Sequence, residues 1–155
     1  MSDLKVGDAA PGFTLPRDGG GKISLSSLKG KTVVVYFYPK DDTPGCTKEA
    51  IGFTEKISDF EAAGATVIGI SKDTVAKHEK FRDKHGLKVI LASDEDGAVC
   101  ESYGVWVEKS LYGRKYMGIE RATFLVDPSG RIVKIWHKVK VAGHVEEVLD
   151  AARGA

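Results

Sequence analysis

Short runs of β-branched and aromatic residues recur along the chain and are separated by turns. The run Thr32–Tyr38 reads TVVVYFY without polar alternation, which is typical of a central strand covered on both faces. Turns rich in glycine and aspartate, at Asp18–Gly21 and Asp127–Gly130, separate pairs of shorter runs and predict hairpins. The pattern predicts strands at Phe13–Leu15, Lys22–Leu25, Thr32–Tyr38, Thr66–Ile70, Val89–Ala92, Ala122–Val126 and Ile132–Trp136.

Between the strand runs, apolar residues recur at the spacing of an α-helix. After Pro44, apolar side chains return at steps of three and four residues as far as about Ala63, and Gly64 ends the pattern. Asp73 or Thr74 is suited to cap the next helix. The same spacing predicts further helices at Val75–His85, about Gly97–Tyr103 and about Gly143–Ala152.

Residues Glu108–Glu120 carry mixed charges and two glycines, Gly113 and Gly118, so we interpret them as a long surface loop. Strands and helices alternate before this loop, and a hairpin and a last helix follow it. This order predicts an α/β fold with a central mixed β-sheet flanked by helices and an N-terminal β-hairpin.

Composition indicates one domain spanning residues 1–155. Of these 155 residues, 42% are hydrophobic and 29% are charged, which is sufficient for one closed core. The 23 basic and 22 acidic side chains leave a net charge of +1, so no electrostatic attraction favours nucleic acid or an anionic membrane as a partner. The N-terminus lacks a basic start followed by an apolar run, which argues against a signal peptide and favours a cytoplasmic protein.

The chain contains two cysteines, Cys46 and Cys100, and no Cys-x-x-Cys pair, which excludes the dithiol chemistry of thioredoxin-type oxidoreductases. The four histidines have no metal-ligand spacing with one another or with the cysteines, so we expect neither a metal site nor a cofactor. We expect His78 and His85, on one predicted helix, to lie at the surface or at its edge.

Cys46 follows Pro44 at a predicted helix start, where unpaired backbone N–H groups favour an anion. Lowering the pKa of a thiol from about 8.5 to about 6 takes roughly 3.4 kcal/mol, whereas a helix terminus commonly supplies about 0.3–1 kcal/mol. A reactive thiol here therefore needs a further donor. Thr43 can offer a hydroxyl, and Arg121, just before a predicted strand, is the best-placed cation. The alternative is that Cys46 is inert packing and Arg121 a solvated charge.

The segment Pro39–Thr47, PKDDTPGCT, fits the Pro-x-x-x-Thr-x-x-Cys motif of peroxiredoxins. The longer Phe37–Glu49 strongly resembles the peroxiredoxin Q, or bacterioferritin comigratory protein, subfamily. The likeness extends to Val6–Phe13, Ser93–Asp96 and Glu120–Asp127. This resemblance implies a thioredoxin-like fold and a thiol peroxidase that reduces hydrogen peroxide and organic hydroperoxides.

The resemblance also implies a role for each matching residue. Cys46 is the expected peroxidatic nucleophile, which becomes a sulfenic acid, and Thr43 is expected to hydrogen-bond the thiolate and the peroxide. Arg121 is expected to supply the cation, and Pro39 to shape the pocket and shield the thiolate from water. Glu49, one turn after Cys46, either orients Arg121 or is an ordinary first-turn acid.

The chain departs from the subfamily at the resolving cysteine. Many members carry it five residues after the peroxidatic cysteine, where Ile51 stands here, and others carry it on the next helix, where Phe81–His85 contains none. The apolar neighbours of Cys100 favour a structural role for that residue. We therefore predict a one-cysteine cycle in which an external thiol reduces Cys46.

The external thiol belongs to thioredoxin, to glutaredoxin or to a low-molecular-weight compound, and the sequence leaves this choice open. Two other cycles also remain open. One uses Cys100 as a resolving cysteine, and the other is a peroxide sensor without turnover. By its resemblance the chain is expected to be a monomer or a weak dimer.

Overall fold

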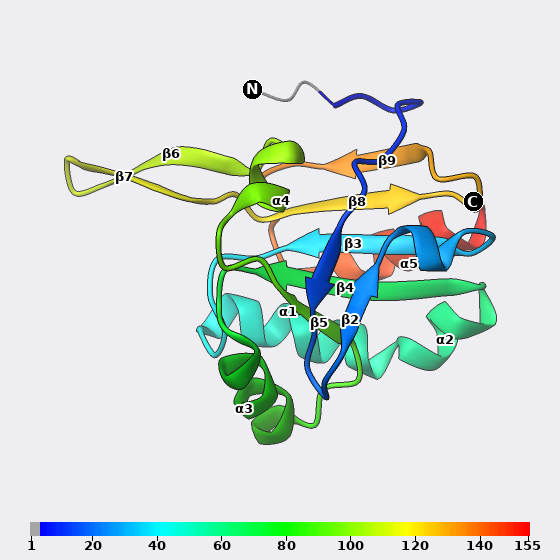
Figure 1. The fold of residues 1–155 in the computed structure, drawn as a ribbon, viewed down its shortest axis with the longest axis horizontal. Helices are drawn as coiled ribbons and strands as arrows, with labels where there is room; N and C mark the ends of the chain where they lie inside the picture. The colour runs from blue at the N-terminus through cyan, green and yellow to red at the C-terminus, as the bar shows by residue number, and fades with distance from the viewer. Residues whose placement is uncertain (1–3) are drawn as a thin grey trace.

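A computed structural model of the protein describes residues 4–155. After the first two strands, strands and helical segments take turns along the chain, with α1 and α2 in succession, until four consecutive strands precede the last helix (Figure 1). The strands are β1 (Thr14–Pro16), β2 (Lys22–Ser24), β3 (Thr32–Phe37), β4 (Ala65–Ser71), β5 (Ile90–Ser93), β6 (Trp106–Leu111), β7 (Arg114–Ile119), β8 (Ala122–Val126) and β9 (Ile132–Trp136). The helices are the 3-10 helix η1 (Ser26–Leu28) and the α-helices α1 (Pro44–Glu55), α2 (Ile57–Ala62), α3 (Val75–His85), α4 (Ala98–Ser102) and α5 (His144–Arg153).

Five strands form the central sheet, in the order β5-β4-β3-β8-β9. β3 is parallel to β4 and β4 is parallel to β5, whereas β8 is antiparallel to both β3 and β9. The sheet is therefore mixed, as predicted. Every residue of β3 is buried, which confirms that the apolar run forms a central strand. The pair β1–β2 is the predicted N-terminal hairpin.

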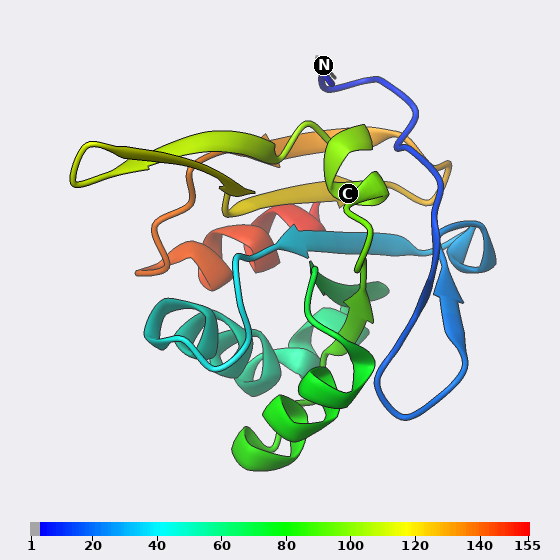
Figure 2. The ribbon, with the colours of Figure 1, turned by 60° about the vertical axis from the view of Figure 1, so that its left-hand side comes forward.

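Alternate residues of β3 face two separate parts of the core. Its odd-numbered residues from 33 to 37 pack with the N-terminal hairpin and with α4. Val34 and Tyr36, together with Tyr38 directly after the strand, pack with α1, α2, α3 and α5. In Figure 2 the N-terminal strands, in dark blue, lie on the right, and α1 and α5 lie on the left. Because side chains alternate across a strand, the sheet separates these two sets of neighbours.

Two predictions about local structure are wrong. Residues 108–120, interpreted as a surface loop, form most of the β6–β7 hairpin, which turns at Tyr112 and Gly113 with positive φ angles of 51° and 77°. Most of this hairpin is exposed or only half-buried, so its sequence lacks the apolar alternation of a strand that packs on a core. The single helix predicted after Pro44 is divided at Lys56, whose φ of −102° separates α1 from α2.

The other predicted strands and helices are confirmed with boundaries shifted by a residue or two. Pro44 begins α1, and Thr74 Oγ1 caps α3 by accepting a hydrogen bond from Lys77 N at 3.2 Å. Gly86 ends α3 in the left-handed conformation, with φ of 62°. Within residues 4–155, every helix is too short or too polar to cross a bilayer.

Candidate active site

Cys46 lies in the first turn of α1, directly after the loop that follows β3. Thr43 is extended, with φ of −94° and ψ of 154°, and Pro44 takes the first helical position. Proline suits this position because the first N–H groups of a helix have no partner within the helix. Cys46 is only 2% exposed. The buried sulfur therefore lies in the first turn of a helix, where the helix dipole favours an anion.

Arg121 brings a cation to this sulfur from a distant part of the chain. Strand β8 begins at the next residue, and Ala122 pairs with Phe37 at the end of β3. This register places Arg121 beside the β3–α1 loop. Its Nη2 atom donates to Cys46 Sγ at 3.2 Å, and its Nη1 atom donates to Glu49 Oε1 at 2.7 Å.

Glu49 is buried one turn after Cys46 and holds the Arg121 guanidinium against the sulfur. Its second oxygen, Oε2, has no hydrogen-bond partner within the part of the chain that the structure describes. Burial raises the pKa of Glu49 to about 7, and the Arg121 charge opposes this rise. Burial also disfavours the Arg121 cation, but Glu49 and Cys46 outweigh this effect and raise the pKa of Arg121. The guanidinium therefore stays charged.

Gly45 leaves space for this guanidinium. A Cβ atom at Gly45 would lie 3.1 Å from Arg121 Nη2, which is a tight contact, so a larger residue would press on the guanidinium. Gly45 is therefore a site residue that the sequence reasoning did not single out. Its one signal in the sequence is its position directly before Cys46.

Thr43 and Pro39 lie in the same loop, but Thr43 is not oriented as expected. Its hydroxyl donates to the backbone oxygen of Lys40 at 2.8 Å. The expected donation to the Cys46 thiolate is therefore replaced by a bond within the loop, although the Thr43 oxygen retains a lone pair that can accept from a peroxide. Pro39 is exposed, so its shielding of the thiolate stays a prediction.

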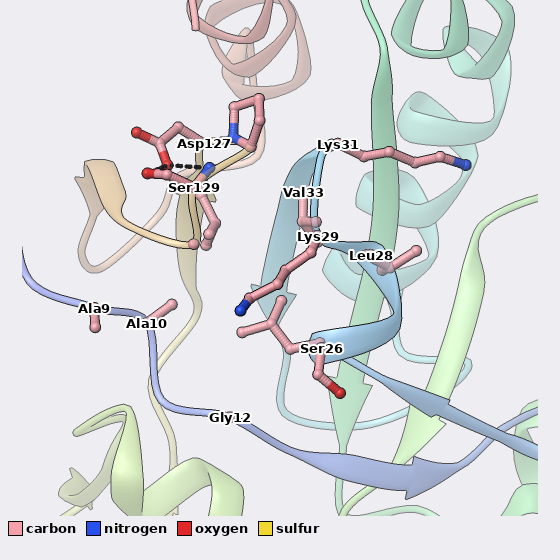
Figure 3. A pocket seen from close by; sticks show the side chains of 14 residues that line it. Ala9, Ala10, Gly12, Ser26, Leu28, Lys29, Lys31, Val33, Asp127 and Ser129 are labelled. Carbon is pink, nitrogen blue, oxygen red and sulfur yellow. Dashed lines mark hydrogen bonds between the residues drawn. The ribbon is translucent and has the colours of Figure 1, made fainter.

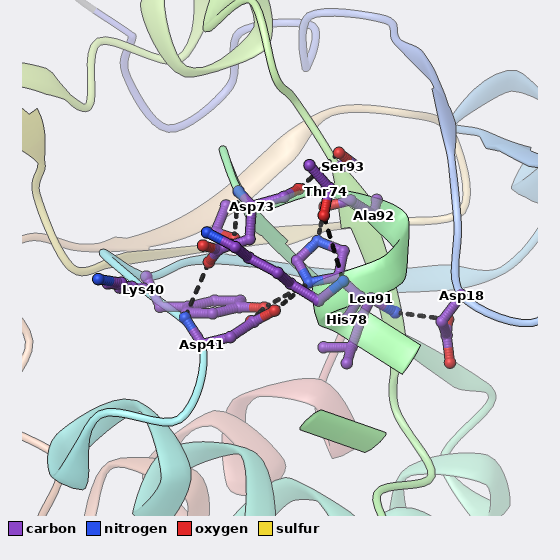
Figure 4. Close-up of polar contacts among 12 residues, drawn as sticks. Asp18, Lys40, Asp41, Asp73, Thr74, His78, Leu91, Ala92 and Ser93 are labelled. Atoms are coloured by element: carbon purple, nitrogen blue, oxygen red, sulfur yellow. Dashed lines mark hydrogen bonds and ion pairs between the residues drawn. The ribbon is translucent and has the colours of Figure 1, made fainter. Parts of the chain in front are cut away.

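Helix α3 fixes the inner side of this loop (Figure 4). His78 Nδ1 lies 2.6 Å from Asp41 Oδ2, and His78 Nε2 lies 2.9 Å from the backbone oxygen of Ala92. Both ring nitrogens therefore face oxygen atoms, one from the β3–α1 loop and one from β5. The prediction that His78 lies at the surface is wrong. It is fully buried, because it lies three residues before Phe81 on the inner face of α3.

Helix α3 also holds the outer side of the loop. Asp42 has a left-handed backbone, with φ of 59°, which costs a residue other than glycine on the order of 1 kcal/mol. Lys84 and His85 contact its carboxylate at 2.8 and 2.9 Å, and their hydrogen bonds lower the pKa of Asp42. His85 is half-buried, in accord with the predicted edge position. Contacts on both sides thus define the loop that leads into Cys46.

Cys100 lies in α4 and packs against the other face of the sheet. Cys46 belongs to the cluster that contains the even-numbered residues of β3, and Cys100 to the cluster that contains the odd-numbered ones. The Cys100 backbone N–H donates to Asp94 Oδ2 at 2.8 Å. Burial, reinforced by Asp94, raises the pKa of Cys100 far above its ordinary value. Because the sheet lies between the two sulfurs, a disulfide between them requires a large rearrangement.

A pocket of about 320 Å³ lies at the opposite end of β3 from Cys46 (Figure 3). The N-terminal segment, the region of η1 and the β8–β9 turn line it, with largely apolar walls. Lys29 and Lys31 also line the pocket, and its lining contains neither a cysteine nor a histidine. This pocket therefore lacks the groups that the chemistry of Cys46 requires.

The geometry agrees with comparisons to known proteins. Residues 6–135 match the model of the AhpC/TSA family. A putative peroxiredoxin Bcp from Coxiella burnetii is 57% identical over 94% of this chain and 97% of its own. Peroxiredoxin Bcp from Bacillus subtilis is 45% identical over 97% of this chain and 96% of its own.

Solved structures of the same kind of protein are similar to this chain over almost its whole length. The bacterioferritin comigratory protein of Xanthomonas campestris, described for its alkyl peroxide reduction activity, has a TM-score of 0.90 at 42% identity and covers 99% of this chain and 98% of its own. A variant of peroxiredoxin Q from Xylella fastidiosa has a TM-score of 0.93 at 39% identity, with 99% and 98% coverage. The expected thioredoxin-like peroxiredoxin fold is thereby confirmed.

Proposed function

The chain belongs to the AhpC/TSA family and is a peroxiredoxin, a thiol peroxidase, and we propose that its catalytic cycle starts at Cys46 and ends with an external thiol. The observation that carries this proposal is the 3.2 Å contact between Arg121 Nη2 and Cys46 Sγ in the first turn of α1. We also propose that residues 1–155 are one domain, because both core clusters share the five-stranded sheet.

In the first half of the cycle, the Cys46 thiolate attacks the terminal oxygen of a hydroperoxide. An S–O bond forms, the O–O bond breaks, and the leaving alkoxide or hydroxide takes up a proton. Cys46 becomes a sulfenic acid, and the products are an alcohol or water. Hydrogen peroxide and organic hydroperoxides both fit this step.

Arg121 and Thr43 support this step in different ways. The guanidinium is already in place where negative charge develops, and a preorganised donor of this kind is commonly worth about 10²–10³ in rate. The Thr43 oxygen, whose own proton is bound to the Lys40 carbonyl, accepts a hydrogen bond from the peroxide. Glu49 orients Arg121 through the 2.7 Å contact with Nη1. Pro39 lies in the same loop, and its proposed role is to shape the pocket and shield the thiolate from water.

In the second half of the cycle, a thiol from outside the chain reduces the sulfenic acid. Four observations support a one-cysteine cycle. Position 51 is isoleucine and α3 contains no cysteine. Cys100 lies beyond the sheet, and its raised pKa disfavours the thiolate that resolution requires. Thioredoxin, glutaredoxin and a low-molecular-weight thiol are all suitable donors, and such a reducing setting is that of the cytoplasm.

The test is steady-state peroxide consumption with dithiothreitol as reductant, followed over many equivalents of peroxide per protein. We expect continuous turnover from the wild type and from Cys100→Ser, and none above the uncatalysed rate from Cys46→Ser. A single stoichiometric oxidation without turnover would favour a peroxide sensor instead. An intramolecular disulfide between Cys46 and Cys100 as the main product of peroxide treatment without reductant would favour the two-cysteine cycle.

A further inference from the structure

The β6–β7 hairpin carries most of the apolar side chains that this fold leaves exposed. Within residues 4–155, six large apolar residues are exposed, and four of them lie on this hairpin. Tyr112, at its turn, is 97% exposed, and its neighbours in this group are Leu111, Tyr116 and Met117. By the hairpin register, Leu111 and Tyr116 share one face with Arg114, and Met117 lies on the other face. Exposed apolar residues that gather on one element mark interaction sites more often than isolated ones do. Tyrosine, methionine and arginine are also the types enriched at the centres of protein interfaces.

The same hairpin is positively charged toward its tip. Lys109, Arg114 and Lys115 lie among the exposed apolar residues, and the segment 109–117 contains no acidic residue. The nearest acid on the hairpin is Glu108, whose carboxylate is 3.9 Å from Lys115. An apolar surface with adjoining cations is complementary to an acidic protein surface.

The hairpin also lies next to the proposed active site. In Figures 1 and 2 it extends outward from the end of the molecule at which β3 terminates, which is the end that carries the β3–α1 loop. Glu120 N donates to the Val105 backbone oxygen at 2.7 Å, and this bond closes the base of the hairpin. Arg121 is the next residue in the sequence. Partial burial and the Arg121 charge lower the pKa of Lys109, which agrees with this closeness.

We propose, building on the proposed function, that the β6–β7 hairpin docks an acidic protein that delivers the reducing thiol to Cys46. A second copy of this chain fits the surface less well. A two-fold contact centred on the hairpin tips would bring Arg114 and Lys115 of one copy close to the same residues of the other. A small thiol has no need of an arm that extends beyond the active site.

The redox step on this surface is balanced if the partner carries two thiols. The first partner thiol attacks the sulfenic sulfur, so that an S–S bond forms, the S–O bond breaks and water leaves. The second partner thiol then attacks its own neighbouring sulfur in the mixed disulfide. This attack releases Cys46 as a thiol and leaves the partner as a disulfide.

The experiment compares two reductants in the full-length protein, an acidic thioredoxin with its reductase and dithiothreitol. The test variants are Arg114→Glu combined with Lys115→Glu, and Tyr112→Ser. The matched charge control is Lys29→Glu combined with Lys31→Glu, at the far end of β3 (Figure 3). The matched apolar control is Val6→Ser, which removes another exposed apolar side chain.

We expect the KM for thioredoxin to rise by about tenfold or more in both hairpin variants and to stay unchanged in both controls, as for loss of an interface hot spot. The KM of the wild type should also rise with salt, whereas that of the charge-reversed variant should not. The rate with dithiothreitol should be the same in all five proteins.

Three results would overturn the docking surface while leaving the peroxidase intact. The first is an unchanged KM for thioredoxin in the hairpin variants, and the second is turnover with dithiothreitol but none with thioredoxin. The third is a wild-type dimer in sedimentation that the hairpin variants abolish, which would assign the surface to a second copy. Loss of turnover with both reductants in the wild type would instead contradict the proposed function itself.

Discussion

Cys46 and Cys100 are buried to almost the same extent, at 2% and 0% exposure, but they lie on opposite faces of the sheet and have different polar neighbours. Cys46 lies in the first turn of a twelve-residue helix and receives a hydrogen bond from the Arg121 guanidinium. Cys100 lies within a five-residue helix beside the Asp94 carboxylate. The comparison teaches that burial does not by itself decide whether a thiol is inert. Burial and, after it, Asp94 raise the pKa of Cys100, whereas Cys46 at a helix start accepts a hydrogen bond from a guanidinium.

The strongest contrast should appear in alkylation of the native protein. With iodoacetamide at neutral pH, we expect Cys46 to be labelled at least about a hundredfold faster than Cys100, because Cys100 requires an opening of the fold before it reacts. Peptide mass spectrometry over a time course measures both rates. Labelling in urea is the control and should bring the two rates together. Equal rates in the native protein would remove the contrast between the two thiols.

Removing the Arg121 cation should make Cys46 less reactive toward peroxide and so more like Cys100. We expect Arg121→Ala to slow the reaction with hydrogen peroxide by about 10²–10³-fold, because a donor aimed at developing charge is lost. Arg121→Lys keeps the charge but cannot contact Cys46 and Glu49 together, so we expect a smaller loss. Stopped-flow measurements with a single turnover report the chemical step. An unchanged rate in Arg121→Ala would show that another group activates Cys46.

Glu49 should make the stability of the fold depend on pH. Burial raises the pKa of Glu49 from 4.5 to about 7, so between these values the folded protein binds more protons than the unfolded chain. The free energy of unfolding should therefore fall as pH rises from about 5 to 8, by at most about 3 kcal/mol. Glu49→Gln should not show this fall.

Urea denaturation of the wild type and Glu49→Gln at pH 5 and pH 8 measures this difference. The 2.7 Å contact with Arg121 acts in the opposite sense to burial. If the wild type instead gained stability relative to Glu49→Gln at pH 8, the ion pair would outweigh burial.

The smallest effect should come from Cys100. Cys100→Ala removes one buried sulfur, and we expect it to lower the free energy of unfolding by about 1 kcal/mol without changing the peroxide rate. Thermal unfolding and the stopped-flow assay give the two numbers. A large loss of peroxide rate with an unchanged unfolding temperature would assign Cys100 a chemical role.

The position of Cys46 between β3 and α1 could be predicted because the sequence patterns that mark both elements are local. A continuous apolar run marks β3, and Pro44 marks the start of α1. Arg121 lies 75 positions from Cys46, and no local pattern joins them. It was nevertheless identified because a helix start alone cannot stabilise a thiolate sufficiently, and because a strand begins directly after it.

The features that escaped prediction depend on contacts rather than on periodicity. The β6–β7 hairpin has no buried face to impose apolar alternation, so it resembled a loop. His78 is polar, and its burial follows from an Asp41 partner on another segment. The orientation of the Thr43 hydroxyl depends on loop geometry that residue types do not specify. Spacing from Phe81 was the one signal that favoured burial of His78.

The most direct measurement is the mass-spectrometric state of both cysteines after one equivalent of hydrogen peroxide, with dimedone present to trap a sulfenic acid. We expect a dimedone adduct on Cys46, an unmodified Cys100 and no disulfide between them. The Cys46→Ser variant, treated in the same way, should yield no adduct. An intramolecular disulfide between Cys46 and Cys100 as the main product would contradict the separation of the two thiols by the sheet.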